Sequence, residues 1–248
     1  MKVEICVNSV ESAVAAQVGG AQRVELCDDL VEGGTTPSFG SITKAREMLD
    51  IKLHVIIRPR GGDFLYSELE FDIMRRDIVE AKRLGVDGIV IGILDADGNI
   101  DAARTRELVE LARPMTVTFH RAFDVSRDAR RSLETLIEIG VDRVLTSGQC
   151  DLAADGKELL AEIIGQADGR IKILVCGGLC PDNIAEIAAS TGADEFHFTA
   201  FKNVESEMRY RNENVPMGGA APASEFVRPV TDPAIVSEML ARLDACRG

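Results

Sequence analysis

Short apolar runs alternate with amphipathic segments along almost the whole chain. Eight runs have the length and β-rich composition of buried strands, and each is followed by a segment with one apolar face at helical spacing. The predicted strands lie at residues 3–9, 23–28, 52–59, 88–94, 116–123, 143–148, 172–178 and 195–201. A long loop at about 203–231, rich in Gly, Pro and Ala in its later part, precedes the last predicted helix, 233–245.

One phrase recurs where four of the predicted helices pass into strands. It begins with Gly20, Gly85, Gly140 and Gly192, as GAQRVEL, GVDGIVI, GVDRVLT and GADEFHF. A glycine just after a helix adopts the left-handed cap conformation without the strain that a Cβ atom would cause. The phrase precedes every second strand, so a βαβα unit is used four times, with parallel strands and right-handed crossovers. Eight strand–helix units favour an α/β fold of one domain over residues 1–248, a closed (β/α)8 or TIM barrel.

The interior of the predicted barrel is unusually polar. Strand alternation turns one set of side chains toward the helices, and that set is uniformly apolar. The opposite set faces the barrel axis and includes Glu4, Cys6, Glu25, Cys27, His54, Arg58, Arg60, His120, Ser147, His197 and Thr199. Barrel interiors are normally filled with Val, Ile and Leu, and barrel enzymes keep their active sites at the carboxyl ends of the strands. Two interpretations are open: a core salt-bridge network in which Glu4 and Glu25 pair with Arg58, or a ligand site.

Composition narrows the classes of partner. The chain of 248 residues carries a net charge of −13, which argues against a general nucleic-acid surface because phosphate backbones require an excess of Lys and Arg. No apolar run is long enough to span a bilayer, and the N-terminus lacks the apolar segment of a signal peptide. We therefore expect a cytoplasmic protein without membrane contact, whose six cysteines are mostly reduced thiols.

Glycine-rich loops are expected at the mouth of the barrel. Arg60 and the GGD turn lie at its rim, so Arg58 is the better candidate for ligand contact. After the last two strands, the exposed amides near Gly177, Gly178 and Thr199 form either an anion site beside a helix N-terminus or a simple tight turn.

Two cysteines occupy matching positions in the first two strands. VEIC and VELC share one offset, so Cys6 and Cys27 are expected side by side, about 4.8 Å apart across adjacent strands. Two thiolates at close range suit Cu(I). The alternative is that both are ordinary buried cysteines, which pack as small apolar residues.

Six phrases in order, VEICVNSVESA, RVELCDDLVEGGTTPS, VIIRPRGGDFLYS, VTFHRAFD, RVLTSGQ and MRYRN, resemble the CutC family of copper homeostasis proteins. The resemblance runs from Val3 to about Asn212. It implies a cytoplasmic TIM barrel that forms dimers or larger homo-oligomers, with Cu(I) proposed at the positions of Cys6 and Cys27. It also matches polar residues at the barrel mouth, which are Glu4, Glu25, His54, Arg58, His120, Asp124, Ser147 and His197. Cys150, Cys176 and Cys180 belong to none of these motifs.

Two functions follow. The first is copper homeostasis, with a Cu(I) ion as the ligand of Cys6 and Cys27. The alternative is a TIM-barrel enzyme acting on a small anionic molecule, including phosphorylated ones, at the barrel mouth. Its candidate catalytic residues are Glu4, Glu25, Arg58 and His120. Its candidate ligand-binding residues are His54, Arg60, Asp124, Ser147, Gly177, Gly178, His197 and Thr199.

Overall fold

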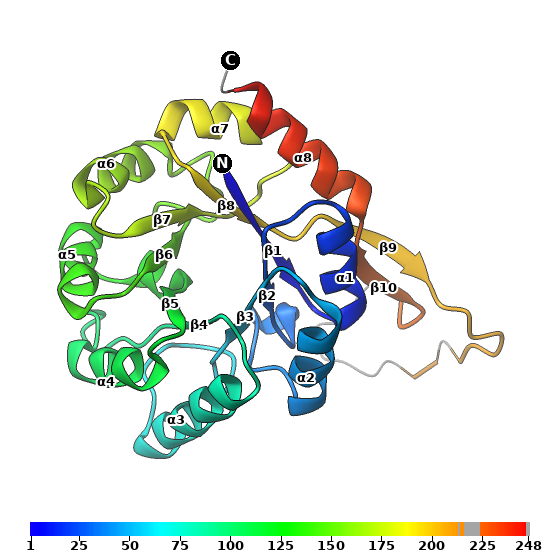
Figure 1. Cartoon of the computed structure of the whole chain (residues 1–248), viewed down its shortest axis with the longest axis horizontal. Coiled ribbons are helices and arrows are strands. Elements are labelled where there is room, and N and C mark those ends of the chain that lie inside the picture. Colours follow the sequence, from blue (N-terminus) through cyan, green and yellow to red (C-terminus); the bar gives the residue numbers. More distant parts are fainter. Residues whose placement is uncertain (213, 216–223, 247–248) are drawn as a thin grey trace.

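Eight parallel strands close into a barrel with helices outside it (Figure 1). The computed structural model describes residues 1–212, 214–215 and 224–246. Each strand pairs with its neighbours in chain order, and the first strand pairs with the eighth. The predicted single-domain TIM barrel is therefore confirmed.

The strands and helices alternate as the hydrophobic pattern predicts. The barrel strands are β1 Lys2–Val7, β2 Arg23–Leu26, β3 Lys52–Ile56, β4 Gly88–Ile91, β5 Thr116–Phe119, β6 Arg143–Thr146, β7 Lys172–Val175 and β8 Glu195–Phe198. The helices are α1 Val10–Val18, α2 Phe39–Met48, α3 Glu68–Arg83, α4 Ala102–Ala112, α5 Ala129–Ile139, α6 Lys157–Ala167, α7 Ile184–Thr191 and α8 Pro233–Ala245. Two short 3₁₀ helices, Leu30–Glu32 and Arg121–Val125, follow β2 and β5.

The recurring glycines take the backbone conformation expected of them. Gly20, Gly85, Gly140 and Gly192 have φ between 74° and 96°, in the left-handed region that favours glycine. At Gly140, the amide donates to the carbonyls of Leu136 and Ile137 and so ends α5. The repeated phrase therefore sets where four helices stop and the next strands begin.

The main hydrophobic core lies between the strands and the helices. The outward-facing strand residues, such as Ile5, Leu53 and Phe196, are completely buried, and they pack against the apolar faces of the helices. Most of the apolar surface that drives folding is buried in this layer, so the fold tolerates polar groups in the barrel interior.

One predicted loop is partly wrong. The segment at about 203–231 was expected to be loop throughout, but it begins and ends in strands: β9 Phe201–Glu205 pairs antiparallel with β10 Val227–Thr231. The hairpin lies beside α1 and α8 (Figure 1), and β10 contacts α1. Residues 213 and 216–223 of the predicted loop lie outside the described residues. The sequence signal was weak because these strands are short and largely exposed.

None of the helices that the structure describes combines the length and the apolar character needed to cross a bilayer.

We predict that Leu53→Ala lowers the free energy of unfolding by about 2–5 kcal/mol, because it leaves a cavity in the layer between β3 and the helices. Leu53 is fully buried, whereas Leu69 on α3 is 72% exposed. Leu69→Ala is therefore the matched control and should stay within about 0.5 kcal/mol of the unmodified chain. Urea unfolding monitored by circular dichroism measures both values. Equal losses for the two variants would contradict this account of the core.

Candidate functional site

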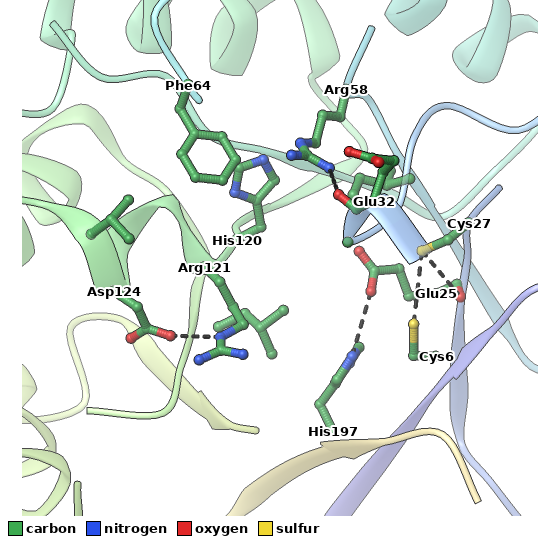
Figure 2. Close-up of a pocket in the computed structure, with 14 residues that line it drawn as sticks. Cys6, Glu25, Cys27, Glu32, Arg58, Phe64, His120, Arg121, Asp124 and His197 are labelled. Carbon is green, nitrogen blue, oxygen red and sulfur yellow. Dashed lines mark hydrogen bonds and ion pairs between the residues drawn. The ribbon is translucent and has the colours of Figure 1, made fainter. Parts of the chain in front are cut away.

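A cavity of about 360 Å³ lies at the carboxyl ends of the barrel strands. Of the residues predicted from the sequence, those that line it are Cys6, Glu25, Cys27, Arg58, His120, Asp124 and His197. Residues that were not among the candidates chosen from the sequence complete the lining: Glu32, Gly33, Ile56, Phe64, Arg121, Val125 and Leu145. Figure 2 shows the two cysteines, Glu25 and His197 on one side of this space, and Phe64, His120 and Arg58 on another.

The two cysteines are close together, as predicted, but they are not direct cross-strand partners: the register is shifted by two residues from the one that matching offsets imply, and Cys6 pairs with Glu25. Their sulfur atoms are 3.8 Å apart, and both side chains are buried. This separation is about twice the length of a disulfide bond, so the pair is a dithiol. Parallel pairing of β1 with β2 sets this arrangement, because Val7 pairs with Leu26 and the amide of Cys27 donates to the carbonyl of Val7.

A network of buried ion pairs lies deeper in the barrel, toward the amino ends of the strands. Arg23 forms a very short ion pair with Glu4, and its Nη2 lies 2.9 Å from Glu195 Oε2. Arg143 binds the same oxygen of Glu195 at 2.8 Å. Both carboxylates are therefore neutralised by arginines at strand starts, which makes this end of the interior a closed ionic core.

The expected pairing of Arg58 with Glu4 and Glu25 is wrong. Among the described residues no carboxylate lies within ion-pair distance of Arg58; its guanidinium donates instead to the carbonyls of Glu32 at 2.6 Å, Gly34 at 2.8 Å and Gly62 at 2.9 Å. β3 ends at Ile56, so Arg58 already belongs to the loop, and its side chain reaches the neighbouring loops instead of the axis. The true partner of Glu4 is Arg23, whose spacing of two from Glu25 could have revealed it.

Glu4 also forms an ion pair with His197. The Nδ1 atom of His197 lies 2.8 Å from Glu4 Oε1, and its Nε2 atom lies 3.6 Å from Glu25 Oε2. Burial opposes the ionisation of Glu4, but Arg23 and the hydrogen bond to His197 outweigh it and hold the pKa of Glu4 well below its usual range. Burial also disfavours the charge of His197, yet contacts with Cys6 and Glu4 raise its pKa well above the usual value. We therefore describe this pair as carboxylate and imidazolium at neutral pH.

This charge pair makes one thiol acidic and leaves the other protonated. The hydrogen bond from Cys27, opposed by burial and helped by His197, lowers the pKa of Cys6 to about 6. The same hydrogen bond raises the pKa of Cys27 well above its usual value, and burial adds to the effect. Burial, together with the nearby Cys6 charge, also raises the pKa of Glu25. At neutral pH the site thus holds a thiolate that accepts a hydrogen bond from a thiol.

The other two histidines differ in depth. His54 is buried below the cavity: Nε2 contacts Thr116 Oγ1 at 3.1 Å, and the residue is not among those that line the space. His120 follows β5 and lines the cavity; its Nδ1 accepts from the amide of Ala122 at 3.1 Å. Burial lowers the pKa of His54 to about 4, and burial together with the charge of Arg58 lowers that of His120 to about 3.

Asp124 and Ser147 act together with a residue that the sequence reasoning missed. Arg121 Nε donates to Asp124 Oδ2 at 2.7 Å, and its Nη2 donates to Ser147 Oγ at 2.6 Å. Ser147 also donates to Asp124 at 2.9 Å. Asp124 and Arg121 therefore face the cavity as a neutralised pair that Ser147 supports from behind. Arg121 belongs to the phrase VTFHRAFD, but it follows the strand, so strand alternation could not predict where its side chain points.

The remaining predicted residues lie away from the cavity. Arg60 is at the rim, as expected, where it pairs with Glu70 at 2.5 Å and with Asp63 at 2.9 Å. Gly177 and Gly178 form a turn that the side chain of Asn183 closes by donating to Gly178 O at 2.8 Å. Thr199 is exposed, and its carbonyl accepts from Thr231 at 3.1 Å. None of these residues is among the described lining of the cavity.

Two overlapping groups of side chains have ligand atoms close enough for one metal ion. Cys6, Glu25 and Cys27 form the first group, and Glu4, Glu25 and His197 form the second; within each group the ligand atoms lie within 4.8 Å of one another. The first offers two soft sulfur atoms and fits Cu(I). The second fits poorly, because Glu4 already neutralises Arg23 and His197 carries a proton.

Fold and site together define a TIM barrel with a buried dithiol at its mouth. Residues 1–202 match the CutC family, and the chain belongs to that family. It is 52% identical to a CutC family protein of Chromobacterium violaceum over 98% of both chains. It is also 48% identical to the mouse copper homeostasis protein cutC homolog, over 93% of this chain and 85% of the mouse protein. The crystal structure of CutC from Streptococcus agalactiae superposes with a TM-score of 0.77 at 34% identity, covering 80% of this chain and 98% of that one.

We predict three distinct histidine titrations, which nitrogen-15 NMR of the three histidine rings measures directly. His54 and His120 should stay neutral down to pH values near 4 and 3, while His197 stays protonated through pH 7. Unfolded histidines bind a proton near 6.5, so below that pH the unfolded state takes up more protons at His54 and His120. Their contribution to stability is therefore full above pH 6.5 and is lost as the pH falls toward 4. A midpoint near 6.5 for His120 would contradict the described burial.

Proposed function

We propose that the chain is a copper-handling protein that binds Cu(I) between Cys6 and Cys27. The observation that carries this proposal is the buried pair of sulfur atoms, 3.8 Å apart, which lines the mouth cavity. Homology to copper homeostasis proteins supports it.

The chemistry of the pair suits a soft monovalent ion. Thiolates select Cu(I) over harder ions, and a low coordination number is compatible with two sulfur ligands. The lowered pKa of Cys6, about 6, makes its sulfur a thiolate at neutral pH, which is the form that binds the ion. Glu25 lies within reach as a further oxygen ligand, and its Oε1 has no partner among the described residues. Burial of the site restricts water and competing ligands, which favours retention of the ion.

A second candidate function is an enzyme acting on a small anionic molecule at the same mouth. One observation favours it: the cavity lining includes Arg58, His120 and Phe64, which copper binding by two sulfur atoms does not use.

The homo-oligomeric state and the cytoplasmic location stay predictions. Light scattering of the purified chain tests the oligomeric state.

We predict that the reduced protein binds one Cu(I) per chain tightly and that Cys27→Ser abolishes this binding. Loss of a ligand should cost more than the roughly 10–100-fold in affinity that loss of a supporting residue costs. Anaerobic titration against a chromophoric Cu(I) chelator measures stoichiometry and affinity. Cys180→Ser is the matched control, because Cys180 is exposed and should leave the tight site unchanged. Unchanged stoichiometry and affinity in Cys27→Ser would overturn the proposed site.

We also predict that Cu(I) binding releases protons in a pH-dependent number. At pH 7.5, a value chosen above the Cys6 pKa of about 6, Cys6 is a thiolate and Cys27 holds its proton. Each bound ion should then displace about one proton, from Cys27, and more as the pH falls below the Cys6 pKa. Proton release in weakly buffered solution, followed with a pH indicator, measures this number. Release of two protons per ion at pH 7.5 would show that Cys6 is an ordinary thiol.

A further inference from the structure

The mouth cavity is lined by a buried guanidinium, that of Arg58, which forms no ion pair with any described residue. Arg58 is 4% exposed, and its guanidinium is held by three loop carbonyls, as described above. Carbonyl dipoles orient the group but do not neutralise it, and its Nε has no hydrogen-bond partner among the described residues. Burying an unpaired charge is costly, so a guanidinium in this state is poised to accept a negatively charged ligand.

His120 provides a second donor at the same place. Because Nδ1 accepts from the amide of Ala122, the neutral ring must carry its hydrogen on Nε2. That Nε2 atom is buried and has no partner among the described residues, although the residue lines the cavity. Because an unsatisfied buried N–H group is costly, a ligand oxygen that reached this atom through a small shift of the ring would relieve that cost.

Phe64 brings the two donors together. Its ring centroid lies 4.9 Å from that of His120 and 5.2 Å from the guanidinium carbon of Arg58. Figure 2 shows the three side chains on one wall of the cavity. Ile56, Val125 and Leu145 add apolar surface to the same space. Two convergent donors within an apolar lining are typical of sites for small organic anions.

We propose that this wall binds the carboxylate of a small monoanionic organic acid, with one oxygen on Arg58 and one on His120. A monoanion is favoured over a phosphate ester for two reasons. Among the described lining residues, Arg58 is the one cation without an ion-pair partner, since Asp124 neutralises Arg121 and Glu4 neutralises His197. Glu32 also lines the cavity, so its carboxylate disfavours a dianion.

This inference rests on the second candidate function and names the chemical class of its anion. Binding of the acid at Arg58 and His120 does not require copper. It therefore requires a test in copper-free, reduced protein. Cu(I) titration and organic-acid binding then succeed or fail separately. Binding without any conversion of the acid would leave this site standing and would count only against the enzyme.

We predict that pyruvate binds the copper-free protein saturably and shifts the Nε2 resonance of His120 in nitrogen-15 NMR. The same titration with inorganic phosphate should give no saturable shift. Because the unmodified chain is used, the result does not depend on whether any variant folds. Absence of saturable pyruvate binding, or a saturable phosphate shift in place of the pyruvate shift, would overturn the proposal.

Two variants locate the ligand. His120→Asn keeps an acceptor for the amide of Ala122 but removes the N–H of the ring, and Arg58→Lys keeps the charge but loses the planar donor edge. His120→Asn and Arg58→Lys should each weaken pyruvate binding by about tenfold or more. Arg60→Lys is the matched control, since Arg60 pairs at the rim and should leave the affinity unchanged. Equal affinities in all four proteins would show that pyruvate binds elsewhere.

Discussion

The ion pair between Arg23 and Glu4 is the interaction on which the candidate site depends. The two residues are direct neighbours across β1 and β2, and Glu4 is in turn the neighbour of His197 across β1 and β8. Arg23 keeps Glu4 ionised in spite of burial. Cys6 and Glu4 together raise the pKa of His197, and His197 adds to the hydrogen bond from Cys27 that lowers the pKa of Cys6. Removing one partner of such a buried pair typically costs about 3–5 kcal/mol, because the other charge stays behind without compensation. Stability and thiol chemistry are thus linked through one carboxylate.

The two ends of the barrel interior differ in whether their buried polar residues line the cavity. Toward the amino ends of the strands, Glu195 binds both Arg23 and Arg143, so that end behaves as a structural core. At the mouth, Glu25 Oε1, Arg58 Nε and His120 Nε2 have no partner among the described residues. Buried polar atoms normally find partners within the fold or in ordered water, so each exception requires a physical explanation. His54 Nδ1 and Arg143 Nη1 also lack a hydrogen-bond partner in the described part of the chain, but neither residue is among the described lining of the cavity, so it is access to the cavity that separates the candidate functional residues from the structural ones.

The periodic parts of the chain were the predictable ones. Alternation placed Glu4, Cys6, Glu25 and Cys27 inside the barrel correctly, and the same rule would have placed Arg23 there. It placed Arg58 at the mouth, where the residue does line the cavity, but it gave the wrong partners for the guanidinium, because strand alternation ends where β3 ends, at Ile56. Beyond that point the loop decides where a side chain points, so Arg58 turned to the loop carbonyls and Arg121 joined the mouth without any periodic signal.

The sequence by itself determined the barrel, because recurring glycine caps and strand–helix alternation are local features that repeat along the chain. It also determined that the interior is polar and that Cys6 and Cys27 both face it, since strand alternation places every second side chain on the axis side. The register of β1 against β2, which pairs Cys6 with Glu25, came only from the tertiary structure. Only the tertiary structure decided which charges pair, which thiol is acidic and which donors remain free. Those properties depend on distances and burial among side chains from different strands and loops, and spacing along one chain does not encode such distances.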